Sequence, residues 1–207
     1  LDRYKNLKNY ISAKKNILNR GNKHINLISI DDQYSKRIFN NKKINNKISF
    51  SIKSINADIY YKNGYLVDNY FYKNKKTKLI NISSDLNGKY NFQNILVAYI
   101  VCKYFRVPIK YFNQSIKNFK GLPYRSLIIY NSKRKLIINN SKATNISSAL
   151  STLENKKNIY LILGGIAKED GFEKFGKFQN EIKQIYIYGK SRFLINNQIS
   201  LFKISKI

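Results

Sequence analysis

Apolar residues recur along the chain with two different periods, and the change between them predicts alternating helices and strands. Segments with helical spacing carry polar residues on the opposite face. Gly21 follows the first of these segments and Pro108 lies at the start of the third, which are typical positions at helix ends. The predicted helices cover residues 4–20, 90–105, 107–119, 145–154, 172–183 and a segment after Lys190.

Short apolar runs bounded by polar residues or glycines predict strands between these helices. "INLISI" (25–30) and "NIYLILGG" (158–165) are apolar enough to be buried strands. Asn63-Gly64 predicts a hairpin between two of the runs, and "SKR" (132–134) separates two others that could pair. The remaining predicted strands cover 48–53, 57–62, 65–72, 78–83, 126–131, 135–140, 184–189 and 200–205.

Strands that alternate with helices predict an α/β fold with a mostly parallel sheet. The glycine and proline in "KGLPYR" (120–125) interrupt the pattern, so we expect two domains, 1–119 and 120–207. In parallel sheets, ligands bind beyond the carboxyl ends of the strands. Two polar segments, 139–145 and 164–172, follow strands in this way and are therefore the first candidates for a site.

The composition is that of a globular chain with an unusual charge. Of 207 residues, 43% are hydrophobic and 14% aromatic, which suffices for a buried core. The net charge of +28 raises nucleic acid or an anionic membrane as a partner. However, residues 1–119 hold 23 Lys or Arg against 6 Asp or Glu, and residues 120–207 hold 16 against 5. Because this excess is spread evenly and consists mostly of Lys, we favour a diffusely charged surface over a nucleic-acid face.

Cysteine and histidine are too scarce for several kinds of site. The single Cys102 lies in an apolar run, which excludes a disulfide framework and a multi-cysteine zinc site. The single His24 has no serine suitably placed beside it, which argues against a Ser-His-Asp or Cys-His enzyme. No apolar run approaches the roughly 20 residues that span a bilayer, and no signal peptide is recognisable, so we expect no membrane span and a cytoplasmic location. The chain contains no Met, so we expect a processed chain or a piece of a longer one.

Five motifs, in this order along the chain, resemble the Mur ligase family and within it the members that add D-glutamate to a peptidoglycan precursor. "LDRYKNLKNYISAKKNI" (1–17) and "LNGKYNFQN" (86–94) resemble the family's central, ATP-binding domain. "GLPYR" (121–125), "INNSKATN" (138–145) and "LILGGIAKEDGF" (161–172) resemble its C-terminal domain. Each motif alone is a weak signal, but five in the right order are specific.

The resemblance implies that residues 1–119 are the remainder of the central ATP-binding domain. It implies that residues 120–207 form a Rossmann-like C-terminal ligase domain, cut short. By comparison with the family, we expect the chain to lack the N-terminal domain, the glycine-rich phosphate loop and the extreme C-terminus. Such a piece should be inactive by itself.

The reaction implied by the resemblance is ATP-dependent amide formation. The carboxylate of UDP-N-acetylmuramoyl-L-alanine takes the γ-phosphoryl group of ATP, and the amine of D-glutamate attacks the resulting acyl phosphate. ATP and Mg²⁺ are the implied cofactors, since cations must neutralise the phosphate charge as it shifts. We expect a monomer that has no specific nucleic-acid partner.

Several residues match positions of the family that hold the nucleotide or the metal. Lys14 matches a catalytic lysine whose carbamate orients Mg²⁺. Asn91 and Asn94 match residues near the adenine, although capping of a helix start explains Asn91 equally well. Arg125 matches an arginine that contacts the nucleotide. Asn140 stands where the family usually has Asp as a partner of the ribose hydroxyls, and it keeps the acceptor but loses the charge.

Three further residues match positions that face the phosphate and D-glutamate. Lys142 is the second catalytic candidate, at the phosphate, while Thr144 and Lys168 match residues of the D-glutamate site. The chain departs from the family pattern, besides Asn140, at Tyr4, Tyr90 and Leu127.

Two other functions remain open from the sequence. A related Mur ligase or a folylpolyglutamate synthetase would share the architecture, although "SKATN" together with "GLPYR" favours D-glutamate addition. A basic nucleic-acid-binding module would need clustered lysines interleaved with aromatic residues. The 17 tyrosines of the chain fall on apolar faces as often as between lysines.

Overall fold

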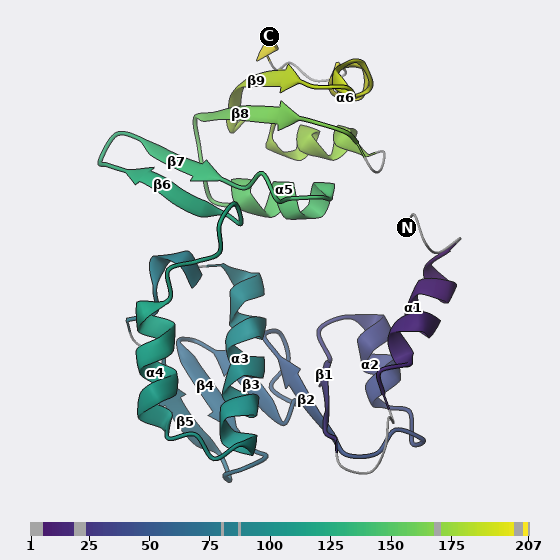
Figure 1. Cartoon of the computed structure of the whole chain (residues 1–207), viewed down its shortest axis with the longest axis vertical. Helices are drawn as coiled ribbons and strands as arrows, with labels where there is room; N and C mark the ends of the chain where they lie inside the picture. Colours follow the sequence, from purple (N-terminus) through teal and green to yellow (C-terminus); the bar gives the residue numbers. More distant parts are fainter. Residues whose placement is uncertain are drawn as a thin grey trace. The chain divides into compact units, whose positions relative to one another are not determined.

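The computed structural model divides the chain into two compact units, Leu1–Lys120 (unit 1) and Gly121–Ile207 (unit 2). It describes residues 6–18, 24–79, 81–86, 88–167, 171–200 and 205–206. Both units combine helices with strands (Figure 1), which confirms the predicted α/β class. None of the helices in the described part of the chain has the length and apolarity to cross a membrane.

Unit 1 contains a five-stranded sheet with the order β1-β2-β3-β4-β5. β1 pairs with β2 and β2 with β3 in parallel, whereas β3, β4 and β5 are antiparallel. The prediction of a mostly parallel sheet therefore holds only for the first three strands of this unit. The strands are β1 (Asn26–Ser29), β2 (Lys47–Ser51), β3 (Ile59–Lys62), β4 (Tyr65–Asp68) and β5 (Lys75–Lys78).

The hairpin predicted at Asn63-Gly64 is confirmed. These two residues connect β3 to β4, and Lys62 is paired with Tyr65 across the turn. Their φ angles of 49° and 84° are both left-handed. Asn and Gly adopt this conformation at low cost, and it matches the twist of the two strands.

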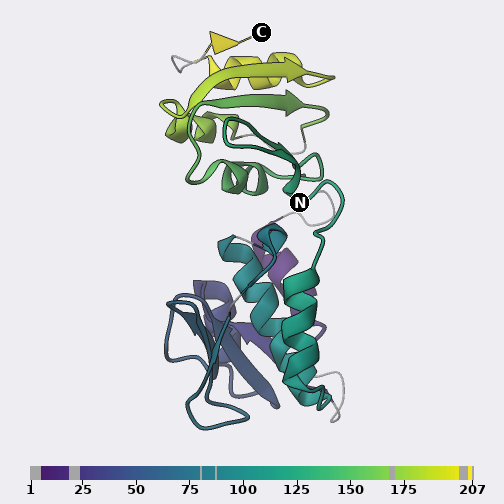
Figure 2. The same ribbon diagram turned by 90° about the vertical axis from the view of Figure 1, so that its left-hand side faces the viewer.

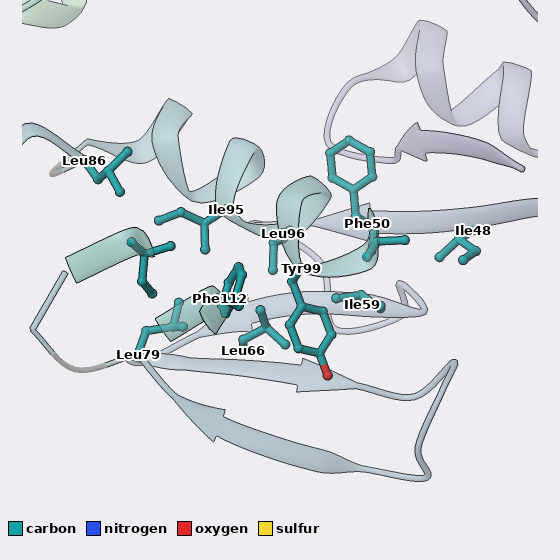
Figure 3. Close-up of a cluster of buried hydrophobic side chains, with 12 residues drawn as sticks. Ile48, Phe50, Ile59, Leu66, Leu79, Leu86, Ile95, Leu96, Tyr99 and Phe112 are labelled. Carbon is teal, nitrogen blue, oxygen red and sulfur yellow. The ribbon is translucent and has the colours of Figure 1, made fainter. Parts of the chain in front are cut away.

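Two long helices cover the sheet of unit 1. The helices of this unit are α1 (Leu7–Lys15), α2 (Gln33–Phe39), α3 (Lys89–Tyr104) and α4 (Ile109–Asn118). Figure 2 shows α3 and α4 together on one face of the sheet. Leu96 and Tyr99 of α3 and Phe112 of α4 pack with Ile59 and Leu66 of the sheet (Figure 3), and these side chains are almost completely buried.

Two predictions for unit 1 are wrong. Within the predicted strand at 78–83, β5 ends at Lys78, and the described residues 79 and 81–83 belong to no strand, although Leu79 and Ile82 pack into the core. β5 itself, "KKTK", has no apolar residue and lies at the sheet edge, where lysines protect against further pairing. The second error is α2, which is absent from the helices predicted from the sequence. Asp32 caps this helix by accepting hydrogen bonds from the amides of Tyr34 and Ser35.

Unit 2 contains a three-stranded parallel sheet with the order β10-β9-β8 and a separate antiparallel hairpin, β6-β7. The predicted pairing around 132–134 is therefore confirmed. Phe175, Ile185, Ile195 and Ile199 form the centre of this unit's core. The elements are β6 (Leu127–Asn131), β7 (Leu136–Asn139), α5 (Ile146–Leu153), β8 (Ile159–Gly164), a 3-10 helix (Phe172–Phe178), β9 (Ile182–Tyr188), α6 (Arg192–Ile199) and β10 (Ser205–Lys206).

Two predictions for unit 2 are also wrong. β8 is not buried on both faces, because Tyr160 and Ile162 are 67% and 73% exposed while their neighbours along the strand face the core. The predicted helix at 172–183 is a short 3-10 helix that ends at Phe178, and β9 begins at Ile182. The apolar residues of this segment therefore belong to two different elements.

Candidate functional site

The first candidate region lies in unit 1 at the start of α3. Gly88 is the N-cap residue of α3 and provides no side-chain cap, so the capping role considered for Asn91 is wrong. Asn91 lies one turn into the helix, where its side-chain Nδ2 donates to the carbonyl oxygen of Asp85 at 3.3 Å. Asn94 is exposed, and its amide donates to Oδ1 of Asn91 at 3.4 Å. The two predicted adenine contacts thus lie side by side.

A hydrogen-bond network fixes the start of α3 to the carboxyl ends of two parallel strands. Gln93, between the two asparagines, donates to the carboxylate of Asp31 at 2.5 Å and to the hydroxyl of Ser29 at 3.3 Å. The same carboxylate accepts hydrogen bonds from the Ser51 hydroxyl and from the amides of Ile52 and Lys53.

The Asp31 carboxylate is stabilised in its charged form by this network. Burial raises the pKa of Asp31, but the hydrogen bonds from Ser51, Gln93, Ile52 and Lys53 outweigh it and hold the pKa below the ordinary value of 3.8. Our sequence reasoning missed this network. An acidic residue directly after an apolar strand was the only available signal for it.

Lys14 lies on the exposed surface of α1, with its Nζ 5.4 Å from the centroid of the Tyr10 ring. Its exposure leaves the amine accessible to dissolved carbon dioxide or bicarbonate. Within the described ranges, no group of three or more His, Cys, Asp or Glu could hold a metal ion. Mg²⁺ commonly binds through only one or two carboxylates together with substrate phosphates and water. A carbamate on Lys14 therefore fits as one such ligand.

The second candidate region lies in unit 2, at the turn between β7 and α5. Asn145 caps α5 by accepting a hydrogen bond from the Ser148 amide at 2.8 Å. Asn139 accepts from the Ser141 amide at 3.1 Å, which shapes the preceding turn. These two asparagines contact the backbone of the turn and of the helix. The side chains of Lys142 and Thr144, in the same turn, are exposed.

A second turn, at residues 124–126, packs against this first one. The Lys142 amide donates to the Tyr124 carbonyl oxygen at 3.0 Å, and the Ser126 amide donates to Oδ1 of Asn140 at 3.1 Å. The Lys142 Nζ is 5.9 Å from the centroid of the Tyr124 ring. The structure thereby brings the exposed Arg125 together with Asn140 and Lys142, although the two motifs are separated in the sequence.

Asn140 uses its side-chain amide fully within unit 2. Its Nδ2 donates to the Ser148 carbonyl oxygen at 3.2 Å and to the Thr152 hydroxyl at 2.7 Å. Its Oδ1 accepts from Ser126, as above. An aspartate could not make the two donated hydrogen bonds, so Asn140 is bound to α5 in a way that the family's usual residue would not reproduce.

The glycine loop after β8 packs tightly against the end of β9. A Cβ on Gly164 would lie 2.2 Å from the Tyr188 carbonyl oxygen, so only glycine fits there. Gly165 has a φ of 103°, which also favours glycine. The Ala167 amide then donates to the Ser191 hydroxyl at 2.9 Å. Lys168, the predicted D-glutamate contact, lies just beyond this point and outside the described residues.

Comparisons with known proteins agree on one family. Residues 1–102 match the family described as the Mur ligase middle domain. The chain is 34% identical to the UDP-N-acetylmuramoylalanine--D-glutamate ligase of Rickettsia prowazekii over 202 residues, which is 95% of this chain and 44% of the relative. The ligase of the same name from Rickettsia bellii is 35% identical over 203 residues, again 95% and 44%. The chain thus spans less than half the length of these curated relatives.

Solved structures with a similar fold are also Mur ligases. UDP-N-acetylmuramate-alanine ligase MurC from Thermotoga maritima matches with a TM-score of 0.63 at 13% identity, over 98% of this chain and 46% of that one. MurF from Acinetobacter baumannii matches with a TM-score of 0.64 at 14% identity, over 96% and 45%. At such low identity these matches establish a shared fold only.

Proposed function

Because the chain belongs to the Mur ligase family, we propose that the full-length product of its gene is an ATP-dependent ligase that joins D-glutamate to UDP-N-acetylmuramoyl-L-alanine. This reaction is a step in making the peptidoglycan precursor, and hence in cell wall biogenesis, cell shape and division. The observation that carries the proposal is the similarity to curated D-glutamate ligases along 95% of the chain. It favours D-glutamate addition over a folylpolyglutamate synthetase or a nucleic-acid-binding module.

The two units are assigned complementary parts of the reaction in this proposal. Unit 1 is the remainder of the central, ATP-binding domain, and unit 2 is the C-terminal ligase domain. The carboxylate of the first substrate attacks the γ-phosphorus of ATP, and ADP leaves. The amine of D-glutamate then attacks the acyl carbon, and inorganic phosphate leaves as the amide forms.

Residues of unit 2 face the transferred phosphate and the amino acid. Lys142 presents an exposed ammonium group that can neutralise phosphate charge. The Thr144 hydroxyl and the Lys168 ammonium are the proposed partners of D-glutamate, with Lys168 pairing with a carboxylate. Arg125 contributes a planar guanidinium suited to phosphate or ribose oxygens.

Contacts with the nucleotide are proposed for each unit by itself. Asn91 and Asn94 contact the adenine, and Asn140 lies at the position of a ribose partner. Lys14, as a carbamate, would be the residue that holds Mg²⁺. When bound, the ion would supply positive charge beside the phosphate oxygens.

The cellular setting of this proposal follows from its substrates. A nucleotide-linked precursor and ATP are both found in the cytoplasm, where we place the protein, and we propose that it acts as a monomer. We assign it no specific nucleic-acid partner, because the basic residues are distributed along both units rather than gathered in one segment.

A kinetic experiment tests the proposed function. The full-length gene product should release phosphate from ATP only when UDP-N-acetylmuramoyl-L-alanine and D-glutamate are both present. Replacing Lys168 by Ala should raise the KM for D-glutamate by about tenfold or more, as expected for a lost charged contact, and should change the KM for ATP much less. Lys183→Ala, an exposed lysine on β9, is the matched control and should leave both constants unchanged. Phosphate release with either substrate omitted would contradict the proposal.

A further inference from the structure

The turn that carries Arg125 has an unusual backbone. Tyr124 and Ser126, on either side of Arg125, have φ angles of 65° and 51°. These are left-handed conformations, which residues other than Gly, Asn and Asp seldom adopt. Two such residues around one exposed arginine are a strained arrangement that the surrounding structure must impose.

The turn between β7 and α5 supplies the contacts that impose it. The carbonyl oxygen of Tyr124 accepts from the Lys142 amide at 3.0 Å, and the amide of Ser126 donates to Oδ1 of Asn140 at 3.1 Å. The backbone of each left-handed residue is therefore held by a hydrogen bond to this turn, and the Ser126 hydroxyl also hydrogen-bonds to that of Thr152 at 3.3 Å. Asn140 is itself fixed to α5, because its Nδ2 donates to the Ser148 carbonyl oxygen and to the Thr152 hydroxyl.

We infer that Asn140 is a positioning residue for Arg125. It holds Ser126 in the left-handed conformation and thereby sets the direction in which the Arg125 side chain leaves the turn. This role rests on the proposed function, in which Arg125 contacts the nucleotide. It goes beyond a contact between residue 140 and the ribose, because Asn140 here acts on nucleotide binding through a second side chain.

The choice of Asn over Asp at position 140 follows from the same contacts. A carboxylate could still accept from the Ser126 amide, but it would face the Ser148 carbonyl oxygen with no proton to donate. Asn140→Asp should therefore loosen the turn. A direct ribose contact alone predicts the opposite, since a charged acceptor would bind the hydroxyl more strongly.

The decisive experiment uses a rescue by glycine. In the full-length gene product, Arg125→Ala should raise the KM for ATP by about tenfold, and Asn140→Ala should raise it by roughly fivefold, with the KM for D-glutamate little changed. Glycine adopts left-handed φ angles without a steric cost. Adding Ser126→Gly to Asn140→Ala should therefore return the KM for ATP to within about twofold of wild type.

A second measurement, hydrogen exchange, tests the inference without an activity assay. In the 207-residue chain, Asn140→Ala should speed hydrogen exchange of the Ser126 amide by about tenfold, while the amides paired between β6 and β7 stay protected. Thr152→Val removes a hydroxyl that accepts from Asn140 and that also hydrogen-bonds to the Ser126 hydroxyl, but it leaves the bond between Asn140 and the Ser126 amide in place. It should therefore produce a smaller change in the same direction.

Distinct outcomes separate this inference from the proposed function. Unchanged exchange at Ser126, an improved KM for ATP in Asn140→Asp, or the absence of rescue by Ser126→Gly would each overturn the positioning role. If the full-length protein shows no D-glutamate-dependent phosphate release, the proposed function fails instead. Calorimetric binding of an ATP analogue to the same variants then replaces the KM as the test.

Discussion

Among single residues, the buried carboxylate of Asp68 dominates the polar interior of unit 1. Asp68 is completely buried at the end of β4 and accepts hydrogen bonds from the Tyr99 hydroxyl at 2.7 Å and from the amides of Tyr70 and Phe71. Burial raises the pKa of Tyr99, and the hydrogen bond to Asp68 raises it further. The phenol is therefore kept as a proton donor to the carboxylate.

Replacing Tyr99 by Phe should destabilise the chain by about 1–3 kcal/mol, because a buried carboxylate loses its side-chain donor. Urea unfolding at neutral pH measures this change. Tyr65→Phe, in an exposed position on β4, is the control and should change the free energy of unfolding by less than about 0.5 kcal/mol.

The pH dependence of this contribution has a defined sign. Tyrosine ionises near pH 10 in the unfolded chain, and the pKa of Tyr99 is raised in the folded chain. The stabilisation is thus complete below about pH 10 and is lost as the pH rises further. Wild type and Tyr99→Phe should therefore become more similar in stability above that pH. A constant difference between pH 7 and pH 11 would contradict this account.

The roles of single residues were only partly predictable from the sequence. Asn145 as a helix cap follows from local pattern, because its partner Ser148 is three residues away. The contact between Gln93 and Asp31 joins residues 62 positions apart, and nothing in a local pattern specifies it. The left-handed Tyr124 was equally unforeseen, because a bulky side chain at that position contradicts local preference.

At the scale of elements, predictions succeeded where local chemistry determines the structure. The Asn63-Gly64 hairpin and the start of α4 after Pro108 depend on backbone preferences of the residues themselves. Predictions failed where pairing with distant chain decides. β5 is a strand because it completes the edge of a sheet, and its sequence "KKTK" carries no apolar signal. The apolar sequence of β8 likewise predicted a buried strand, but burial of each face depends on which distant elements pack against it, and one face is exposed.

The helix after the "SKATN" turn, α5, allows a test of how much its N-cap residue stabilises the fold. Asn145→Ala removes the hydrogen bond to the Ser148 amide and should cost about 1 kcal/mol of stability. Asn145→Asp keeps an acceptor of the same shape and should cost much less, since Asp and Asn cap helices about equally well. Thermal unfolding of the two variants makes the comparison. An equal loss in both would show that the amide group, and not the cap, is what matters.

At the scale of the whole molecule, the apolar cores stabilise the fold and the net charge opposes it. Each unit has its own apolar core, built on Leu96 and Tyr99 in unit 1 and on Phe175 and Ile185 in unit 2. The net charge of +28 is spread over both. Such a charge says little about the fold, but it opposes compaction, because like charges repel one another over distances longer than a hydrogen bond.

Salt should therefore stabilise this chain. Raising NaCl from about 0.01 M to about 1 M shortens the screening length from about 30 Å to about 3 Å, which removes most of the repulsion between surface lysines. Each kcal/mol gained should raise the unfolding temperature by about 2–4 °C for a chain of this size. Calorimetric scans over this range measure the effect for both units.

DNA binding measured across the same salt range distinguishes a diffusely charged surface from a dedicated nucleic-acid site. A diffusely charged surface predicts weak binding to any DNA sequence that disappears at high salt, because it depends on counterion release alone. A dedicated nucleic-acid site predicts a preference for one sequence or structure that persists as salt rises. If the unfolding temperature stayed constant while such a preference appeared, the lysines would be a binding surface and the diffuse-charge interpretation would be wrong.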